Sequence, residues 1–155
     1  KTMVHRELLE DLAAVEETII ERSRTDAELA SYIRTIRSIE GYNYRRVDGT
    51  ATLSNHSYGI AVDFLPPSYR SLQVYWRWAQ ASGLEWYTVP NERRYLIPDS
   101  FVEAFEAHGF VWGGKWQFFD TIHFEYRPEI LILNGLLQAD GSLSPAAGPG
   151  PTAEP

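Results

Sequence analysis

Two short stretches of this sequence place potentially reactive side chains among alternating apolar residues. The first covers positions 54–63 and contains His56, and the second covers positions 120–125 and contains His123. Aspartate is depleted in β-strands, so Asp63, inside Gly-Ile-Ala-Val-Asp-Phe-Leu, calls for a role beyond packing. If the two stretches are neighbouring strands, Asp63 and His123 share one face of the sheet, and His56 reaches that face from the preceding loop.

Two imidazoles and one carboxylate form a suitable ligand set for zinc. Three protein ligands leave the fourth tetrahedral position to water, which is the pattern of a catalytic site. Such a site also needs a second carboxylate that accepts a proton from the water, and Asp120 and Glu125 are the local candidates. The alternative is that each histidine is a hydrogen-bonded structural residue, and we assign that role to His5 and His108.

The remaining pattern predicts one α+β domain that positions these residues. Helices are expected over 5–22, after a Thr25–Glu28 capping box, over 71–82, over 100–108 after a Ser100–Glu103 capping box, and from Pro128 to about Leu133. Strands are expected over 59–65 and 121–126, with a short one near Tyr44–Val47. Within the two longer strands the residues expected to enter the core are Ile60, Val62, Phe64, Ile122, Phe124 and Tyr126.

Composition narrows the class of protein. A net charge of −7, with no Lys/Arg cluster larger than a pair, argues against a nucleic-acid partner. There is no apolar run near 18 residues, so we expect no membrane span. The absence of cysteine removes disulfides and thiolate metal sites. The Ala-, Gly- and Pro-rich stretch 139–155 is predicted to be a disordered tail after a domain at 1–138, and we expect a monomer.

The two polar stretches resemble the D-alanyl-D-alanine metallopeptidase family, whose pattern is S-x-H-x-x-G-x-A-x-D followed much later by an acid-x-x-H motif. The fixed positions of the first motif are present as Ser54, His56, Gly59, Ala61 and Asp63. The second motif is present as Asp120-Thr121-Ile122-His123, and the resemblance covers about residues 40–130. The family includes D,D-dipeptidases, D,D-carboxypeptidases and L-alanyl-D-glutamate endopeptidases, and it shares its fold and metal set with the hedgehog signalling domain.

The resemblance implies a small antiparallel sheet that carries the zinc site and packs against the N-terminal and surrounding helices. It implies one zinc ion per chain with three ligands, His56, Asp63 and His123. It also implies that Asp120 is the catalytic base, although many relatives have Glu there, which leaves the substrate subgroup open. An upstream arginine of the family binds the scissile carbonyl or stabilises the oxyanion. Arg45 aligns best with it, and Arg46 is the alternative.

Further residues near the motifs are candidates for substrate contact. Ser54 either binds substrate or orients the loop that carries His56, and Tyr58 is a second substrate candidate. The segment Trp112-Gly113-Gly114-Lys115-Trp116 is expected to wall the cleft with Trp116, the alternative being that both indoles pack in the core. Glu125 is expected to accept a hydrogen bond from an imidazole N–H of a metal ligand.

The function that the resemblance implies is a zinc peptidase that cleaves peptidoglycan stem peptides with D-Ala termini. We favour a D-Ala–D-Ala carboxypeptidase, with an L-Ala–D-Glu endopeptidase as the alternative. A non-catalytic zinc module that binds wall peptide or a partner protein is a second alternative, and the presence of Asp120 favours the enzyme. Membership of the family implies export to the periplasm or cell envelope.

Overall fold

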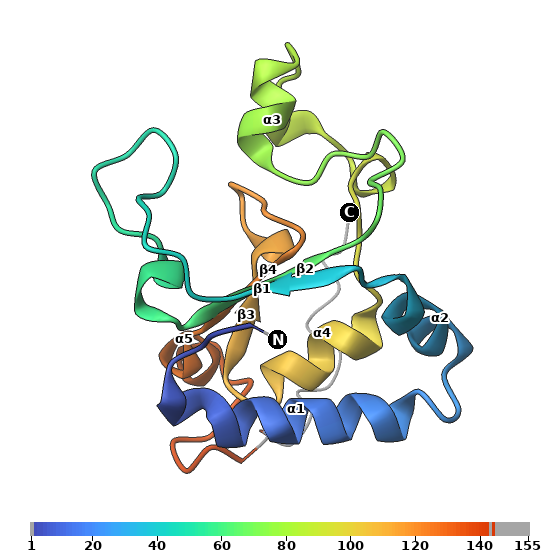
Figure 1. The fold of residues 1–155 in the computed structure, drawn as a ribbon, viewed down its shortest axis with the longest axis vertical. Helices are drawn as coiled ribbons and strands as arrows, with labels where there is room; N and C mark the ends of the chain where they lie inside the picture. The colour runs from blue at the N-terminus through green and yellow to red at the C-terminus, as the bar shows by residue number, and fades with distance from the viewer. Residues whose placement is uncertain (1, 143, 145–155) are drawn as a thin grey trace, which may run out of the picture.

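The computed structural model describes residues 2–142 and 144, and within them the strands form a four-stranded antiparallel sheet (Figure 1). Its order is β1 (Ser38–Glu40), β2 (Ala61–Leu65), β4 (His123–Tyr126) and β3 (Phe110–Trp112). The predicted α+β architecture with a small antiparallel sheet is therefore confirmed. Most of the predicted disordered tail, 139–155, lies outside the described residues, because positions 143 and 145–155 are not among them.

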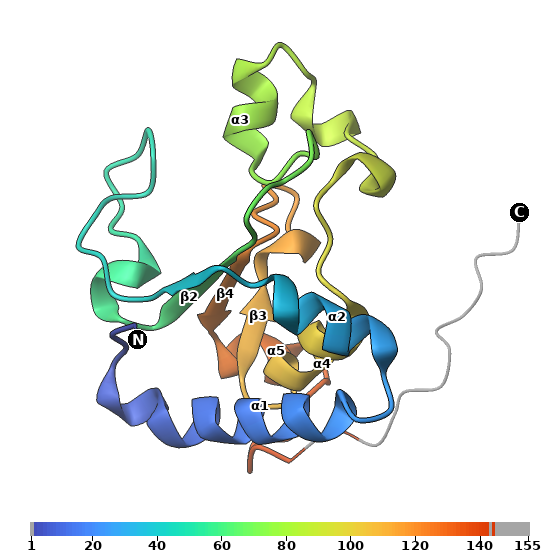
Figure 2. The same ribbon diagram turned by 45° about the vertical axis from the view of Figure 1, so that its right-hand side comes forward.

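Helices cover one face of the sheet and leave most of the other to loops. On the covered face lie α1 (Leu9–Arg22), α2 (Ala27–Thr35) and α4 (Asp99–Glu106) (Figures 1 and 2). The opposite face looks toward α3 (Trp76–Ala81) and the loop 42–54, which project from it, while α5 (Pro128–Leu133) follows β4. Short 3-10 helices are η1 (Arg6–Leu8), η2 (Asn55–Tyr58), η3 (Trp86–Thr88), η4 (Asn91–Arg93) and η5 (Gly113–Lys115). In the described part of the chain, no helix is long and apolar enough to cross a membrane.

Phenylalanine rings from the sheet and α4 build the main core. Phe64 of β2 and Phe124 of β4 lie 5.7 Å apart between ring centroids, and Phe105 of α4 packs 4.4 Å from Phe124. Val62 shares this side of the sheet, as the alternation predicts. Burying three large rings contributes several kcal/mol in total, since truncating one to alanine typically costs about 3–5 kcal/mol. Because this side is committed to the core, Asp63 and His123 are forced onto the other side.

Both predicted capping boxes are wrong, and one aspartate explains why. The carboxylate of Asp26 accepts a hydrogen bond from the Leu29 backbone N–H at 2.9 Å, so Asp26 rather than Thr25 caps α2. The Ser100 hydroxyl donates to the same carboxylate at 2.6 Å from within α4, whose N-cap is Pro98. A carboxylate accepts two such bonds and so ties the starts of two helices together.

The segment before α3 is extended rather than helical, so the helix predicted over 71–82 begins only at Trp76. Gln73 forms a parallel bridge with Arg94, and Tyr75 forms an antiparallel bridge with Asp120. These tertiary hydrogen bonds override the helical periodicity of the segment. The strand predicted near 44–47 is likewise reduced to a single bridge between Arg46 and Leu53.

Candidate metal centre

Three elements bring the predicted ligands together. Asp63 of β2 lies directly opposite His123 of β4 in the antiparallel register. His56 enters from η2, which ends in a left-handed turn at Gly59 with φ of +69°. A side chain at Gly59 would be strained there, and its Cβ would lie 2.7 Å from the backbone nitrogen of His5. The turn therefore returns the chain into β2 directly under the histidine.

The candidate ligand atoms are His56 Nε2, Asp63 Oδ1 and His123 Nδ1, and all three residues are buried. The carboxylate oxygen lies 3.2 Å from His56 Nε2 and 2.8 Å from His123 Nδ1. The two ring nitrogens lie 3.2 Å apart. Bonds of about 2.0–2.1 Å to a tetrahedral metal imply ligand–ligand separations of about 3.3–3.4 Å. The three atoms therefore form a triangle close to the size that zinc requires.

Hydrogen bonds on the outer side of each ring fix which nitrogen is free. His56 Nδ1 lies 2.6 Å from the carbonyl oxygen of Gly41 and must donate to it, which leaves a lone pair on Nε2. His123 Nε2 lies 3.1 Å from Glu125 Oε2, which leaves the lone pair on Nδ1. With both rings neutral, two lone pairs and the Asp63 carboxylate face one point, an arrangement that either a metal ion or a proton would satisfy.

The pKa shifts of His123 and Asp63 also favour a positive charge between the two side chains. Burial alone would lower the pKa of His123, but its hydrogen bonds with Asp63 and Glu125 raise that pKa to about 10. Burial likewise opposes ionisation of Asp63, yet hydrogen bonds from His123 and His56 hold its pKa well below the usual range. A metal ion bound here would therefore have to displace the proton on His123.

Glu125 contacts His123 on the side of the ring that faces away from the candidate metal position. Its Oε2 accepts a hydrogen bond from Asn55 Nδ2 at 2.7 Å, and its Oε1 lies 3.2 Å from Arg127 Nη1. Burial raises the pKa of Glu125, but the hydrogen bond from His123 outweighs this and lowers it, so the carboxylate stays ionised. The sequence did not single out Asn55, although it occupies a variable position of the first motif. Nothing in the sequence marks Gly41, whose backbone carbonyl makes the contact.

Asp120 lies just before β4, close enough to the candidate ligands for their charges to shift its pKa. Burial raises the pKa of its carboxyl group to about 6, with Asp63 adding to the rise and the positive charges of His123 and Arg45 opposing it. Its backbone N–H donates to the Gly113 carbonyl at 3.0 Å, which fixes the loop. A carboxyl group with a pKa near neutrality both accepts and returns a proton readily.

The structure distinguishes between the two candidate arginines. Arg45 Nη2 lies 4.0 Å from Asp63 Oδ2, and Arg45 lines a cavity of about 310 Å³ together with His56 and Asp63. Arg46 instead donates to the backbone carbonyl of Ala51 within the loop. A larger hollow of about 470 Å³ runs along α1, but it contains none of the predicted site residues.

The residues of the segment 112–116, which was expected to wall the cleft, lie in different surroundings. The Trp116 ring centroid lies 5.5 Å from that of His123, beside the candidate metal centre, and the partly buried ring also packs against the small core cluster of Val111, Leu131 and Leu137. Trp112 is buried in the core, where its indole N–H donates to the Thr121 carbonyl at 2.9 Å. Lys115 is paired with Glu106 at 2.6 Å and is therefore engaged away from the ligands.

The other predicted positions lie on or near η2. The Ser54 hydroxyl is buried and accepts a hydrogen bond from the His56 backbone N–H at 3.3 Å, which supports the orienting role rather than substrate contact. Tyr58 is exposed on η2. His5 caps η1, and His108 lies 3.2 Å from the Thr18 hydroxyl, so neither joins the metal centre.

Comparison with family models matches residues 48–126 to the D-alanyl-D-alanine carboxypeptidase family. The match spans just over half of the 155 residues and includes His56, Asp63, Asp120 and His123, while Arg45 precedes it. The protein is therefore a peptidase by class. The chain belongs to the D-alanyl-D-alanine carboxypeptidase family, which confirms the resemblance seen in the sequence. Comparisons with curated proteins and with solved structures gave no match.

Proposed function

We propose that the protein is a zinc-dependent peptidase that removes the terminal D-Ala from D-Ala–D-Ala stem peptides of peptidoglycan. The observation that carries this proposal is the convergence of two imidazole lone pairs and the Asp63 carboxylate, with Asp120 nearby. Zinc bound by His56, Asp63 and His123 would supply a Lewis acid that polarises the peptide carbonyl and lowers the pKa of water.

The Asp120 carboxylate is the group proposed to move the proton. It is ionised above a pH of about 6, so at neutral pH it accepts a proton from the attacking water. The same raised pKa makes the protonated carboxyl group an acid strong enough to deliver that proton to the leaving amine. A site without such a group would bind peptide without cleaving it, so Asp120 favours an enzyme over a non-catalytic module.

Arg45 is proposed to bind the substrate. Its guanidinium is partly exposed beside Asp63, where it can donate to the scissile carbonyl oxygen or to a terminal carboxylate. Arg46 and Lys115, also considered as carboxylate partners, are held by Ala51 and Glu106. Carboxylate recognition therefore depends on Arg45 in this proposal. A cleft that instead accepts chain on both sides would favour the alternative, an L-Ala–D-Glu endopeptidase.

Two further parts of the proposal follow from the family. The substrate, a peptidoglycan stem peptide, lies in the cell wall, so we propose that the protein acts after export, in the periplasm or cell envelope. We also propose that it acts as a monomer, because its candidate ligands and proton acceptor all come from one chain.

The experiment that tests the proposal offers the zinc-loaded protein a pentapeptide stem with either a free or an amidated C-terminus, and products are identified by mass spectrometry. We expect release of D-Ala from the free acid only. Arg45→Ala should weaken this reaction with zinc still bound, whereas Arg46→Ala, the matched control, should leave it near the wild-type rate. Equal cleavage of both peptides, or a cut beside D-Glu, would reject the carboxypeptidase in favour of the endopeptidase.

A further inference from the structure

Ser57 follows the candidate ligand His56 on η2, and its hydroxyl group contacts a different segment of the chain. The hydroxyl oxygen accepts a hydrogen bond from the Arg45 backbone N–H at 2.9 Å. The same hydroxyl donates to the Arg45 carbonyl oxygen at 2.7 Å. A serine hydroxyl has one donor and two acceptor positions, so both bonds can form at once. One side chain therefore holds both polar groups of the Arg45 backbone.

Other hydrogen bonds of the segment 43–45 also lead to η2 and its N-cap. The Ser54 backbone N–H donates to the Arg45 carbonyl at 3.0 Å, and the Asn43 backbone N–H donates to the His56 carbonyl at 3.1 Å. The Asn43 carbonyl lies 3.4 Å from the Ser57 hydroxyl and is a second, more distant acceptor for it. The segment 43–45 therefore runs alongside the short helix that carries His56.

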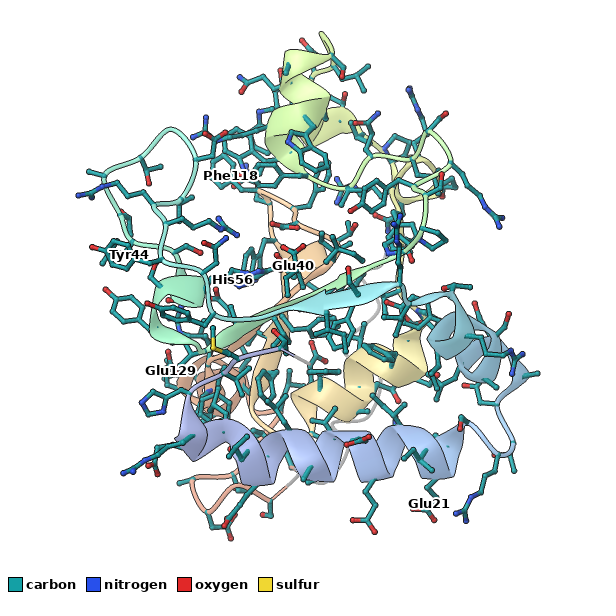
Figure 3. The ribbon with its side chains drawn as sticks, in the orientation of Figure 1. Glu21, Glu40, Tyr44, His56, Phe118 and Glu129 are labelled. Atoms are coloured by element: carbon teal, nitrogen blue, oxygen red, sulfur yellow. The ribbon has the colours of Figure 1, made fainter. Side chains whose placement is uncertain are left out.

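The Arg45 side chain points from this segment toward the metal centre. Tyr44 is 71% exposed, and Figure 3 shows it on the outer side of the loop, away from His56. Arg45 Nη2 lies 4.0 Å from Asp63 Oδ2, and Arg45 lines the same cavity as His56 and Asp63. Among the described residues, this distant ion pair is the only polar side-chain contact of the guanidinium. The position of the guanidinium therefore depends on where the Arg45 backbone is held.

We propose that Ser57 is a positioning residue that fixes Arg45 relative to the metal centre by holding its backbone against η2. Because η2 also carries His56, one short element then sets the places of a metal ligand and of the substrate-binding cation. This inference rests on the proposed function, because it takes Arg45 to bind the peptide substrate. Without the hydroxyl, the Arg45 backbone N–H loses its partner, and its carbonyl keeps only the bond from Ser54.

The test measures binding of the pentapeptide stem with a free C-terminus by calorimetry, in zinc-loaded Asp120→Ala, in which cleavage is slowed. We expect Ser57→Ala to weaken binding by about three- to tenfold, because an arginine that is not held in place loses more freedom when it binds. Ser57→Thr, which keeps the hydroxyl, should restore binding to near the parent value. Ser23→Ala, the matched control, removes a hydroxyl that donates to a backbone carbonyl at 2.8 Å at the end of α1 and should change nothing.

A double-mutant cycle shows whether Ser57 acts through Arg45. Arg45→Ala should weaken peptide binding more than Ser57→Ala does, and adding Ser57→Ala to Arg45→Ala should cause no further loss. All variants should keep about one zinc per chain by elemental analysis, because the bond between His56 and the Gly41 carbonyl is unaltered. Additive losses, unchanged binding in Ser57→Ala, loss of its zinc, or a failure of Ser57→Thr to restore binding would each overturn the positioning role.

Binding and cleavage together separate this inference from the proposed function. If the wild type releases no D-Ala but Ser57 and Arg45 are still coupled in peptide binding, the proposed reaction is wrong and the positioning role stands. If the wild type releases D-Ala but Ser57→Ala binds the peptide as tightly as its parent does, the positioning role alone is overturned.

Discussion

Replacing Glu125 by glutamine tests how the centre maintains the tautomer of His123. The carboxylate accepts hydrogen bonds from His123 Nε2 at 3.1 Å and from Asn55 Nδ2 at 2.7 Å on one oxygen, and from Arg127 at 3.2 Å on the other. Glutamine has nearly the same shape but carries no charge and replaces one acceptor with a donor. The amide must therefore turn a donor toward at least one of three existing donors.

The size of the effect follows from these contacts. Loss of the ionised partner makes His123 Nδ1 a poorer ligand, and changes of this type typically weaken metal binding by about 10- to 100-fold. That corresponds to roughly 1.4–2.8 kcal/mol of metal-binding free energy. At fixed free zinc well above both dissociation constants, the free energy of unfolding should fall by a similar amount, because zinc stabilises the folded state to which it binds.

The assay is a competition titration of zinc against a chromophoric chelator at constant pH. The matched control is Glu129→Gln, which removes the same charge from a carboxylate that also pairs with Arg127 but does not contact His123. We expect the control to bind zinc as the wild type does. Unchanged affinity in Glu125→Gln, or an equal loss in both variants, would refute the role assigned to this carboxylate.

Three other changes have defined outcomes. Gly41→Ala should weaken zinc binding and lower Tm, because the added Cβ would lie 2.2 Å from the Met3 carbonyl oxygen and displace the carbonyl that holds His56; calorimetry with and without zinc measures both. Asp120→Ala should keep its zinc, measured by elemental analysis, and lose about a hundredfold or more in kcat. In a pH–rate profile of the wild type, kcat/KM should fall about tenfold per unit below a pH of about 6, where Asp120 becomes protonated. The charge of bound zinc moves this limb to lower pH, never higher.

The strand patterns predicted the part of the site that depends on alternation. A period of two assigns Phe64 and Phe124 to the core and Asp63 and His123 to the opposite face, and the antiparallel register then pairs the last two. This works because burying aromatic rings leaves only one register that is compatible with a folded sheet. The motif spacing placed His56 beside them through the turn at Gly59.

The parts that the sequence did not reveal depend on long-range contacts. β1 and β3 are only three residues each, too short to show a period, and their partners lie more than ten residues away. The support that Gly41 gives to His56 follows from β1 and was therefore not foreseen. Asp26 shows the same limit, because its second hydrogen bond comes from Ser100 on a distant helix.

The zinc content of the purified protein tests the central claim most directly. Elemental analysis after dialysis should find about one zinc per chain in the wild type, since three converging ligands with fixed tautomers favour tight binding. His56→Ala and His123→Ala should each lose most of that zinc and melt at a lower temperature. Full zinc occupancy in both variants would contradict the assignment of these residues as the metal centre.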